Sequence, residues 1–172
     1  TKLQSSTVFC VIPVHNRLDF TKGCLEQLSQ QSFPNVRAIV IDDGSTDGTV
    51  AYLDELAAIH SKDGSKRTSK TSSKRGKKRR RRTKNSRIKN PSLRGMRIIK
   101  NEENLGFAAG NNQGMAAARG DYVLLLNNDV VVTTGWLGRM ISCAERNPKI
   151  GIVGPRSNYV SGPQLVKDVT YS

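Results

Sequence analysis

Short apolar runs alternate with segments of helical periodicity along this chain, and this alternation constrains the fold more than any other feature of the sequence. Runs such as "TVFCVIPV" and "YVLLLN" are short, continuous and apolar, which predicts buried strands. We expect strands at 7–14, 36–42, 96–100, 122–127 and 150–155, and helices at 17–31, 49–60, 107–119 and 135–146. Buried strands separated by helices are typical of an α/β fold with a mostly parallel sheet and helices on both faces.

One strongly basic segment interrupts this pattern. The chain has 172 residues and a net charge of +14, but fifteen Lys or Arg residues and one acid lie between positions 62 and 89. The rest of the chain is therefore neutral, with thirteen basic and thirteen acidic residues. Because residues 61–95 are rich in Ser, Thr, Lys and Arg and almost lack apolar residues, we predict a disordered insertion in a single domain formed by 1–60 and 96–172. This insertion has two possible roles: it is a solvated tether, or it binds anionic membrane or RNA.

The remaining composition narrows the class of protein. No apolar stretch approaches the roughly 18 residues that a membrane span requires. The three cysteines, Cys10, Cys24 and Cys143, are widely spaced in apolar or helical patterns, which argues against a disulfide framework or a metal cluster. We expect a cytoplasmic protein, with peripheral contact at the inner face of the membrane through the basic segment. The start at Thr1 and the end at "VTYS" indicate part of a longer protein.

Polar segments follow the predicted strands, where ligands of parallel sheets collect. "HNR" follows the first strand, "DDGSTDGT" the second, and "NNDV" the strand at 122–127. After the third strand, "NEENLGFAAGNNQG" brings Asn104 and Gly106 to the same rim, and its small residues allow close approach of the backbone to a ligand.

These segments suit a nucleoside diphosphate bound with a divalent metal, Mn²⁺ or Mg²⁺. A carboxylate can accept a hydrogen bond from the imide N–H of uracil or thymine, and Asp42 or Asp43 fits this role. Asp129 fits a second role, as ligand of a cation that neutralises a diphosphate leaving group. Each motif also has a plain interpretation: "DDGS" as a turn with a helix cap, "NND" as the end of a strand, and His15 as a polar loop residue.

The ordered motifs "VIPVHNR", "VIDDGSTDGT" and "NLGFAAGNNQGMAAARGDYVLLLNND" resemble the family 2 glycosyltransferases of the GT-A fold, especially their rhamnosyltransferase-like branch. The resemblance covers nearly all of the chain outside 61–95. It implies a nucleotide-sugar donor, UDP- or dTDP-linked, and an inverting single displacement to a hydroxyl of a glycan or lipid-linked acceptor.

The resemblance also implies roles for individual residues. Pro13 and His15 would form the wall around the base, with the imidazole of His15 stacked on it. Asp43 would bind the pyrimidine N–H, and Asp42 would support the loop or the ribose. Asp129 would bind the metal, with Asn128 near the ribose or the diphosphate.

Three departures from the family pattern bear on these roles. Family members often carry an acid where Asn127 or Asn128 stands, and an arginine where Asn111 precedes the Asn-x-Gly motif. The usual general base is an aspartate well downstream of the metal motif, but only Asp168 follows Asp129, and we leave that role unassigned. We therefore expect the chain to be the donor-binding half of a larger domain.

Two other classes remain as alternatives. The first is a catalytically inactive relative that keeps the fold as an interaction domain. The second, a nucleic-acid-binding module, is disfavoured because the basic segment has no interleaved aromatic residues. A dehydrogenase is disfavoured because "PVHNR", and not G-x-G-x-x-G, follows the first strand.

Overall fold

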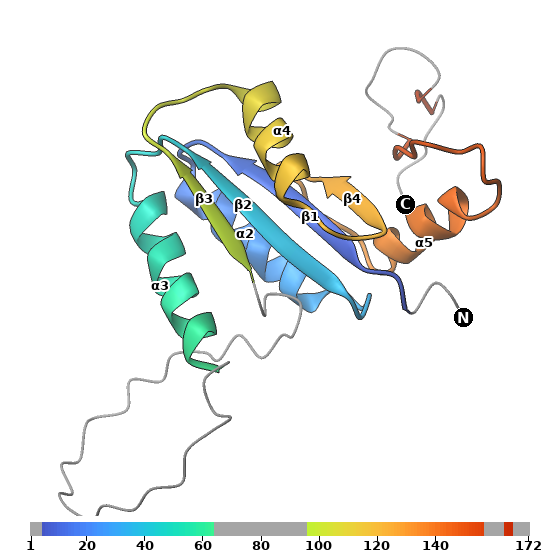
Figure 1. Cartoon of the computed structure of the whole chain (residues 1–172), viewed down its shortest axis with the longest axis horizontal. Coiled ribbons are helices and arrows are strands. Elements are labelled where there is room, and N and C mark those ends of the chain that lie inside the picture. The colour runs from blue at the N-terminus through green and yellow to red at the C-terminus, as the bar shows by residue number, and fades with distance from the viewer. Residues whose placement is uncertain (1–4, 64–95, 157–163, 167–172) are drawn as a thin grey trace, which may run out of the picture.

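A computed structural model describes residues 5–63, 96–156 and 164–166 of the chain. In this part, strands and helices alternate from the first strand to the last helix (Figure 1). The elements are β1 (Val8–Val14), α2 (Leu18–Gln30), β2 (Val36–Asp43), α3 (Thr49–Asp63), β3 (Arg97–Asn101), α4 (Phe107–Ala117), β4 (Tyr122–Leu125) and α5 (Trp136–Ala144).

The strands form one parallel sheet in the order β3-β2-β1-β4, which confirms the predicted fold class. β1 pairs with β2 along its whole length, from Val8 opposite Val36 to Val14 opposite Asp42. On its other side β1 pairs with the shorter β4, which ends opposite Val11. The chain reverses its direction of winding between β1 and β4, and this reversal is the topological switch point of a doubly wound sheet.

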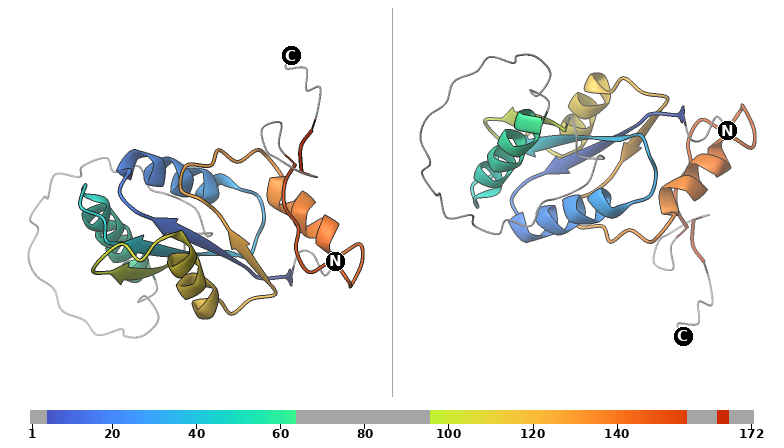
Figure 2. Two further views of the ribbon diagram at one scale, coloured as in Figure 1. Left: turned by 90° about the horizontal axis from the view of Figure 1, so that it is seen from above. Right: turned by 90° about the horizontal axis from the view of Figure 1, so that it is seen from below.

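Helices cover both faces of the sheet (Figure 2). Alternate residues of β1 and β2, including Ile12 and Val40, form one core with Leu25 of α2 and Leu53 of α3. α5 adds two buried side chains to this same core. The residues between them on the strands, Val11, Ile39 and Ile41, face α4. The period of two along each strand thus divides the apolar side chains between two separate layers.

A glycine lets α4 lie close to the sheet. A Cβ atom at Gly114 would come within 2.2 Å of Val11 Cγ1 and 2.8 Å of Ile41 Cδ1, whereas one at Gly110 would make ordinary contacts at 3.6 and 3.8 Å. The glycine at 114 is therefore a packing requirement, and the one at 110 is not. The close approach packs α4 against β1 and β2.

One predicted element is absent, and several boundaries differ. Residues 150–155 were expected to form a strand, but they are irregular in the structure. This prediction was wrong because an apolar run becomes a strand only when its backbone finds a partner, and among the described residues β4 pairs with β1 alone. α3 continues to Asp63, three residues beyond the predicted helix end. The rest of the predicted insertion, 64–95, lies outside the described residues.

Two further sequence expectations concern cysteines and membranes. All three cysteines are free. Within the described ranges, no helix has both the length and the apolar character needed to cross a membrane.

Candidate nucleotide-binding edge

The loops that follow β1 and β2 are fastened to each other at the carboxyl edge of the sheet. His15 Nδ1 donates to the Asp43 carbonyl oxygen at 2.7 Å, because a carbonyl can only accept. The Asn16 N–H donates to Ser45 Oγ at 2.8 Å, and the Thr46 N–H donates to Asn16 Oδ1 at 2.7 Å. These three bonds hold the two loops as one rigid unit.

The hydrogen bonds of His15 also define its tautomer. With Nδ1 protonated, Nε2 is free to accept, and the Asn16 side-chain amide lies 3.2 Å from it. The ring is exposed at the rim. Asn16 and Arg17 both have left-handed backbone conformations, with φ of 57° and 58°. Such strain in two consecutive non-glycine residues often occurs at ligand sites, where the surrounding structure sustains it.

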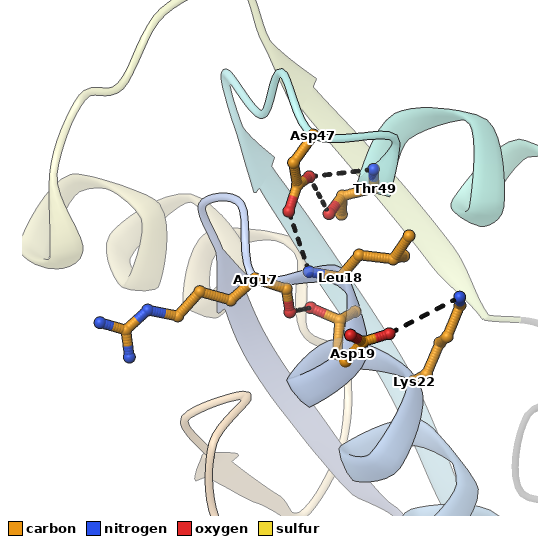
Figure 3. Close-up of polar contacts among 7 residues, drawn as sticks. Arg17, Leu18, Asp19, Lys22, Asp47 and Thr49 are labelled. Atoms are coloured by element: carbon orange, nitrogen blue, oxygen red, sulfur yellow. Dashed lines mark hydrogen bonds and ion pairs between the residues drawn. The ribbon is translucent and has the colours of Figure 1, made fainter.

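Asp47 joins the first turns of two helices (Figure 3). Its Oδ2 accepts from the N–H of Leu18, the first residue of α2, at 2.9 Å. Its Oδ1 accepts from the N–H and the hydroxyl of Thr49, the first residue of α3. The hydrogen bond from the Thr49 side chain is the largest of the effects that lower the pKa of Asp47. Asp47 therefore caps the start of α3 and also fixes the start of α2.

Asp43 binds the loop after β3. Its Oδ1 accepts from Asn101 Nδ2 at 2.8 Å and from the Leu105 N–H at 3.0 Å, and its Oδ2 accepts from the Gly106 N–H at 2.9 Å. Only 4% of the residue is exposed. Burial acts to raise the pKa of Asp43, but these hydrogen bonds, with a smaller electrostatic effect of His15, together lower it below the ordinary value. The carboxylate is thus held ionised beneath the loop.

Asp42 lies on the opposite face of the same strand and is bonded differently. It is 1% exposed, and its Oδ1 is buried without a hydrogen-bond partner. A buried carboxylate oxygen without a donor is costly and rare in native proteins. An incoming donor group would satisfy it.

Gly44 lets these loops approach closely. It has φ of 71°, and a Cβ atom there would lie 2.7 Å from the backbone carbonyl carbon of Glu103. The loops after β2 and β3 therefore touch backbone to backbone. Within the loop after β3, Asn104 Oδ1 also accepts from the Gly106 N–H, at 2.9 Å.

The residues after β4 lie beside α2. Asn128 Nδ2 donates to Thr21 Oγ1 at 3.1 Å, and Asp129 is exposed. Burial raises the pKa of the Cys24 thiol to about 11, and the negative charge of Asp129 adds to this rise. Asp129 therefore lies near the middle of α2, on the β1–β4 side of the edge.

The fit of a metal ion rests on Asp129. No cluster of three or more His, Cys, Asp or Glu side chains suited to a metal ion occurs in the parts of the chain that the structure describes. A single exposed carboxylate suits Mg²⁺ or Mn²⁺ when the ion takes its other ligands from phosphate oxygens and water. A single carboxylate is too few for a site in which the protein supplies all the ligands of the ion.

The predicted residues divide into two groups. The structure brings together Pro13, His15, Asp42, Asp43, Asn104 and Gly106 around the ends of β1, β2 and β3. Asn128 and Asp129 follow β4 on the other side of β1. Asp168 lies outside the described residues. Sequence reasoning missed Asn16, Ser45, Asn101 and Gln113, although "HNR" and "DDGS" were the signals for the first two.

Two cavities lie away from this edge. One, of about 550 Å³, lies where the loop before β2 meets α5. A second, of about 490 Å³, is lined by β4, α5 and residues 150–155. Neither cavity is lined by any of the carboxylates described above.

A parallel sheet with polar loops gathered at its carboxyl edge defines a doubly wound α/β domain of the nucleotide-binding type. The glycosyl transferase family 2 model matches residues 9–90 and 76–169. The chain belongs to this family, and its fold is GT-A.

Relatives of known sequence and structure are longer than this chain. It is 24% identical over 147 residues to an uncharacterized glycosyltransferase of Haemophilus influenzae, covering 86% of this chain and 35% of that protein. It is 20% identical over 155 residues to glycosyltransferase GlyG of Streptococcus pneumoniae, covering 90% of this chain and 40% of that one. The chain thus spans about two fifths or less of the length of these relatives.

Two solved structures show the same fold. The mannosyltransferase PcManGT of Pyrobaculum calidifontis, in complex with GDP-Man and Mn²⁺, has a TM-score of 0.61 and 19% identity, covering 85% of this chain and 34% of its own. S. aureus TarS 1–349, in complex with UDP, has a TM-score of 0.55 and 18% identity, covering 81% of this chain and 32% of its own.

Proposed function

We propose that this chain is the donor-binding half of a glycosyltransferase of the rhamnosyltransferase-like branch, which uses a UDP- or dTDP-linked sugar. The observation that carries the proposal is the pair of carboxylates at the end of β2, one ionised beneath a loop and one with an unsatisfied oxygen. The family membership and the GDP-Man bound by one structural relative support a nucleotide-sugar donor, and the UDP bound by the other supports a pyrimidine base.

The base would lie against the loops after β1 and β3. The imide N–H of uracil or thymine would donate to Asp43, whose lowered pKa keeps it an acceptor at neutral pH. The exposed ring of His15 would stack on the base, and Pro13 would form part of the wall. The backbone carbonyl of Asp43 holds His15 in place by a hydrogen bond. Asp43 would therefore support both the contact to the imide N–H and the ring that stacks on the base.

The ribose would satisfy Asp42. A hydroxyl donor directed at Oδ1 would pair the one carboxylate oxygen that the protein leaves without a partner. A hydrogen bond to a charged group contributes about 1.5 to 3 kcal/mol.

Asp129 would hold the divalent cation, Mn²⁺ or Mg²⁺, beside the diphosphate, with Asn128 near the ribose or the diphosphate. Such an ion would neutralise charge that develops on the diphosphate as the sugar leaves. Asn128 is already oriented by its bond to Thr21.

Transfer with inversion needs a general base within hydrogen-bond reach of the acceptor hydroxyl. We assign this base, and the binding of a glycan or lipid-linked acceptor, to the part of the larger domain that this chain does not span. The chain by itself is then expected to bind the donor without completing the transfer.

The basic segment would serve a separate purpose. We place it as an insertion at 61–95 into one domain formed by 1–60 and 96–172, because its basic, apolar-poor composition differs from that of the rest of the chain. Its cations would contact anionic lipid at the inner face of the membrane, or RNA, in the cytoplasm. The second candidate function, a catalytically inactive interaction domain, is favoured only by the missing general base.

A binding screen tests the proposal. UDP, dTDP and GDP are titrated calorimetrically into the chain, each with and without Mn²⁺ or Mg²⁺. We expect UDP or dTDP to bind, with tighter binding when the metal is present. Binding of GDP alone would contradict the pyrimidine assignment, and no binding of any nucleotide would favour the inactive interaction domain.

The metal site has its own test. Asp129→Asn should abolish the effect of Mn²⁺ on UDP binding and leave uridine binding unchanged, because the cation contacts phosphates and not the base. Asp121→Asn is the matched control, since Asp121 is an exposed acid at the opposite end of β4. Equal losses for uridine and UDP in Asp129→Asn would indicate a structural role instead.

A further inference from the structure

The carboxylate of Asp43 has nearly all of its accepting positions filled. An ionised carboxylate offers about four, two on each oxygen. Oδ1 accepts from Asn101 and Leu105, so it is full, while Oδ2 accepts from Gly106 alone. Any further donor must therefore approach Oδ2.

The amide group of Asn101 that bonds to Asp43 is held in place by the amide group of Gln113. Asn101 Nδ2 donates to Gln113 Oε1 at 2.9 Å, and Gln113 Nε2 donates back to Asn101 Oδ1 at 3.0 Å. This reciprocal pair connects the end of β3 to α4. It fixes the amide group that Asn101 presents to Oδ1 of Asp43.

The Gly106 N–H is shared between two acceptors. It lies 2.9 Å from Asp43 Oδ2 and 2.9 Å from Asn104 Oδ1. A shared hydrogen bonds each acceptor less strongly than a single partner would. If Oδ2 turned to another donor, the N–H would keep a complete bond to Asn104.

We propose that Asn104 is a positioning residue for the nucleotide base: it shares the Gly106 N–H with Asp43 Oδ2, and by taking a larger part of that hydrogen when the base binds it leaves Oδ2 a stronger acceptor for the imide N–H, which enters its open position. This inference rests on the proposed function. Because Asp43 is only 4% exposed, the loop must shift at Gly106 for a base to reach it. Gly106 has φ of 88°, and no atom lies within 4 Å of the position that a Cβ would take, so the space beside this residue is open.

The test compares two ligands in wild type and Asn104→Ala. UDP carries the imide N–H, and ribosyl diphosphate lacks the base. Without Asn104, the Gly106 N–H loses its second acceptor, and UDP should bind roughly fivefold more weakly. Binding of ribosyl diphosphate should not change. Asn104→Ser, which keeps a side-chain acceptor capable of the same turn, should restore part of the UDP affinity.

Asn147→Ala is the matched control. Asn147 Oδ1 accepts from the N–H two residues ahead, as Asn104 does, but it lies after α5 and outside the candidate site. UDP and ribosyl diphosphate should each bind to Asn147→Ala with the same affinity as to wild type.

The outcomes separate the exchange from the proposed function. Equal weakening of both ligands by Asn104→Ala would mean a merely structural role and would overturn the inference, as would unchanged UDP binding. If wild type bound neither UDP nor dTDP, the proposed function would fail and the exchange with it. If wild type bound UDP and Asn104→Ala made no difference, only the exchange would fail.

Discussion

The close packing of α4 on the sheet gives opposite predictions for two glycines one turn apart. At Gly114 an added methyl group meets Val11 Cγ1 at 2.2 Å and Val11 Cγ2 at 3.1 Å. Val11 is β-branched and fully buried, so rotating its side chain only exchanges one methyl contact for the other. Gly114→Ala must therefore push α4 away from β1.

The size of the effect follows from two terms. Replacing Gly by Ala inside a helix favours folding by about 1 kcal/mol, whereas overpacking a well-packed core costs about 1 to 3 kcal/mol. Gly114→Ala should thus lower the free energy of unfolding by up to about 2 kcal/mol. Gly110→Ala, with contacts at 3.6 and 3.8 Å, should raise it by up to about 1 kcal/mol.

Urea unfolding followed by circular dichroism measures both variants, with midpoints compared at equal slope. The helix-propensity term is common to both, so the difference between them isolates the clash. Equal midpoints, or a Gly114→Ala protein more stable than Gly110→Ala, would refute the close approach of α4 to Val11.

Two further predictions concern acid stability and the basic segment. The folded-state pKa of Asp43 lies below its ordinary value of 3.8, so its contribution to stability should be complete above that pH and disappear as the pH falls through the lowered value. Denaturant midpoints between about pH 2 and 6 should therefore show a smaller acid-induced loss in Asp43→Asn than in wild type, and losses of equal size would contradict this assignment. Because α3 ends at the amino edge of the sheet, replacing 64–89 with a short Gly/Ser bridge should change UDP affinity by less than about threefold, since charges are screened over about 8 to 10 Å. Binding to anionic vesicles or RNA should fall sharply in the same deletion, and a large loss of UDP affinity would show that the segment reaches the site.

Local pattern was sufficient to predict the parallel sheet. β1 and β2 are almost entirely buried, whereas β3 and β4 are only partly covered, and each of the four strands has an apolar run that is visible in the sequence. The run at 150–155 looks the same but forms no strand, because a strand depends on a neighbouring backbone that the run itself does not specify. Boundaries also moved by a few residues at helix ends, where the helical pattern fades gradually.

The contacts of the site were harder to predict than its position. The rule that parallel strands present their ligands at the carboxyl edge placed Asp42, Asp43 and the loop at 101–106 together. It could not show that Asp43 would bind that loop, since Leu105 and Gly106 are 62 and 63 residues away in the sequence. Their meeting depends on β3 lying next to β2, which follows from the order of the strands and not from any local motif.

The alternation of β2 explains why two adjacent aspartates have different environments. Ile41 and Asp43 point to the side of α4, and Val40 and Asp42 to the side of α2 and α3. On the first side, the loop after β3 folds over the strand end and supplies backbone and amide donors, so Asp43 is fastened and ionised. On the second side, the donors of the loops after β1 and β2 go to Ser45, Asn16 and Asp47, and none of them reaches Asp42 Oδ1. A pair of carboxylates at a strand end is thus divided by the strand's own geometry into one that holds a loop and one that needs a donor from outside. The second is the stronger evidence for a ligand, because a role confined to turns and caps accounts for Asp43 and Asp47 but leaves Oδ1 of Asp42 without a partner.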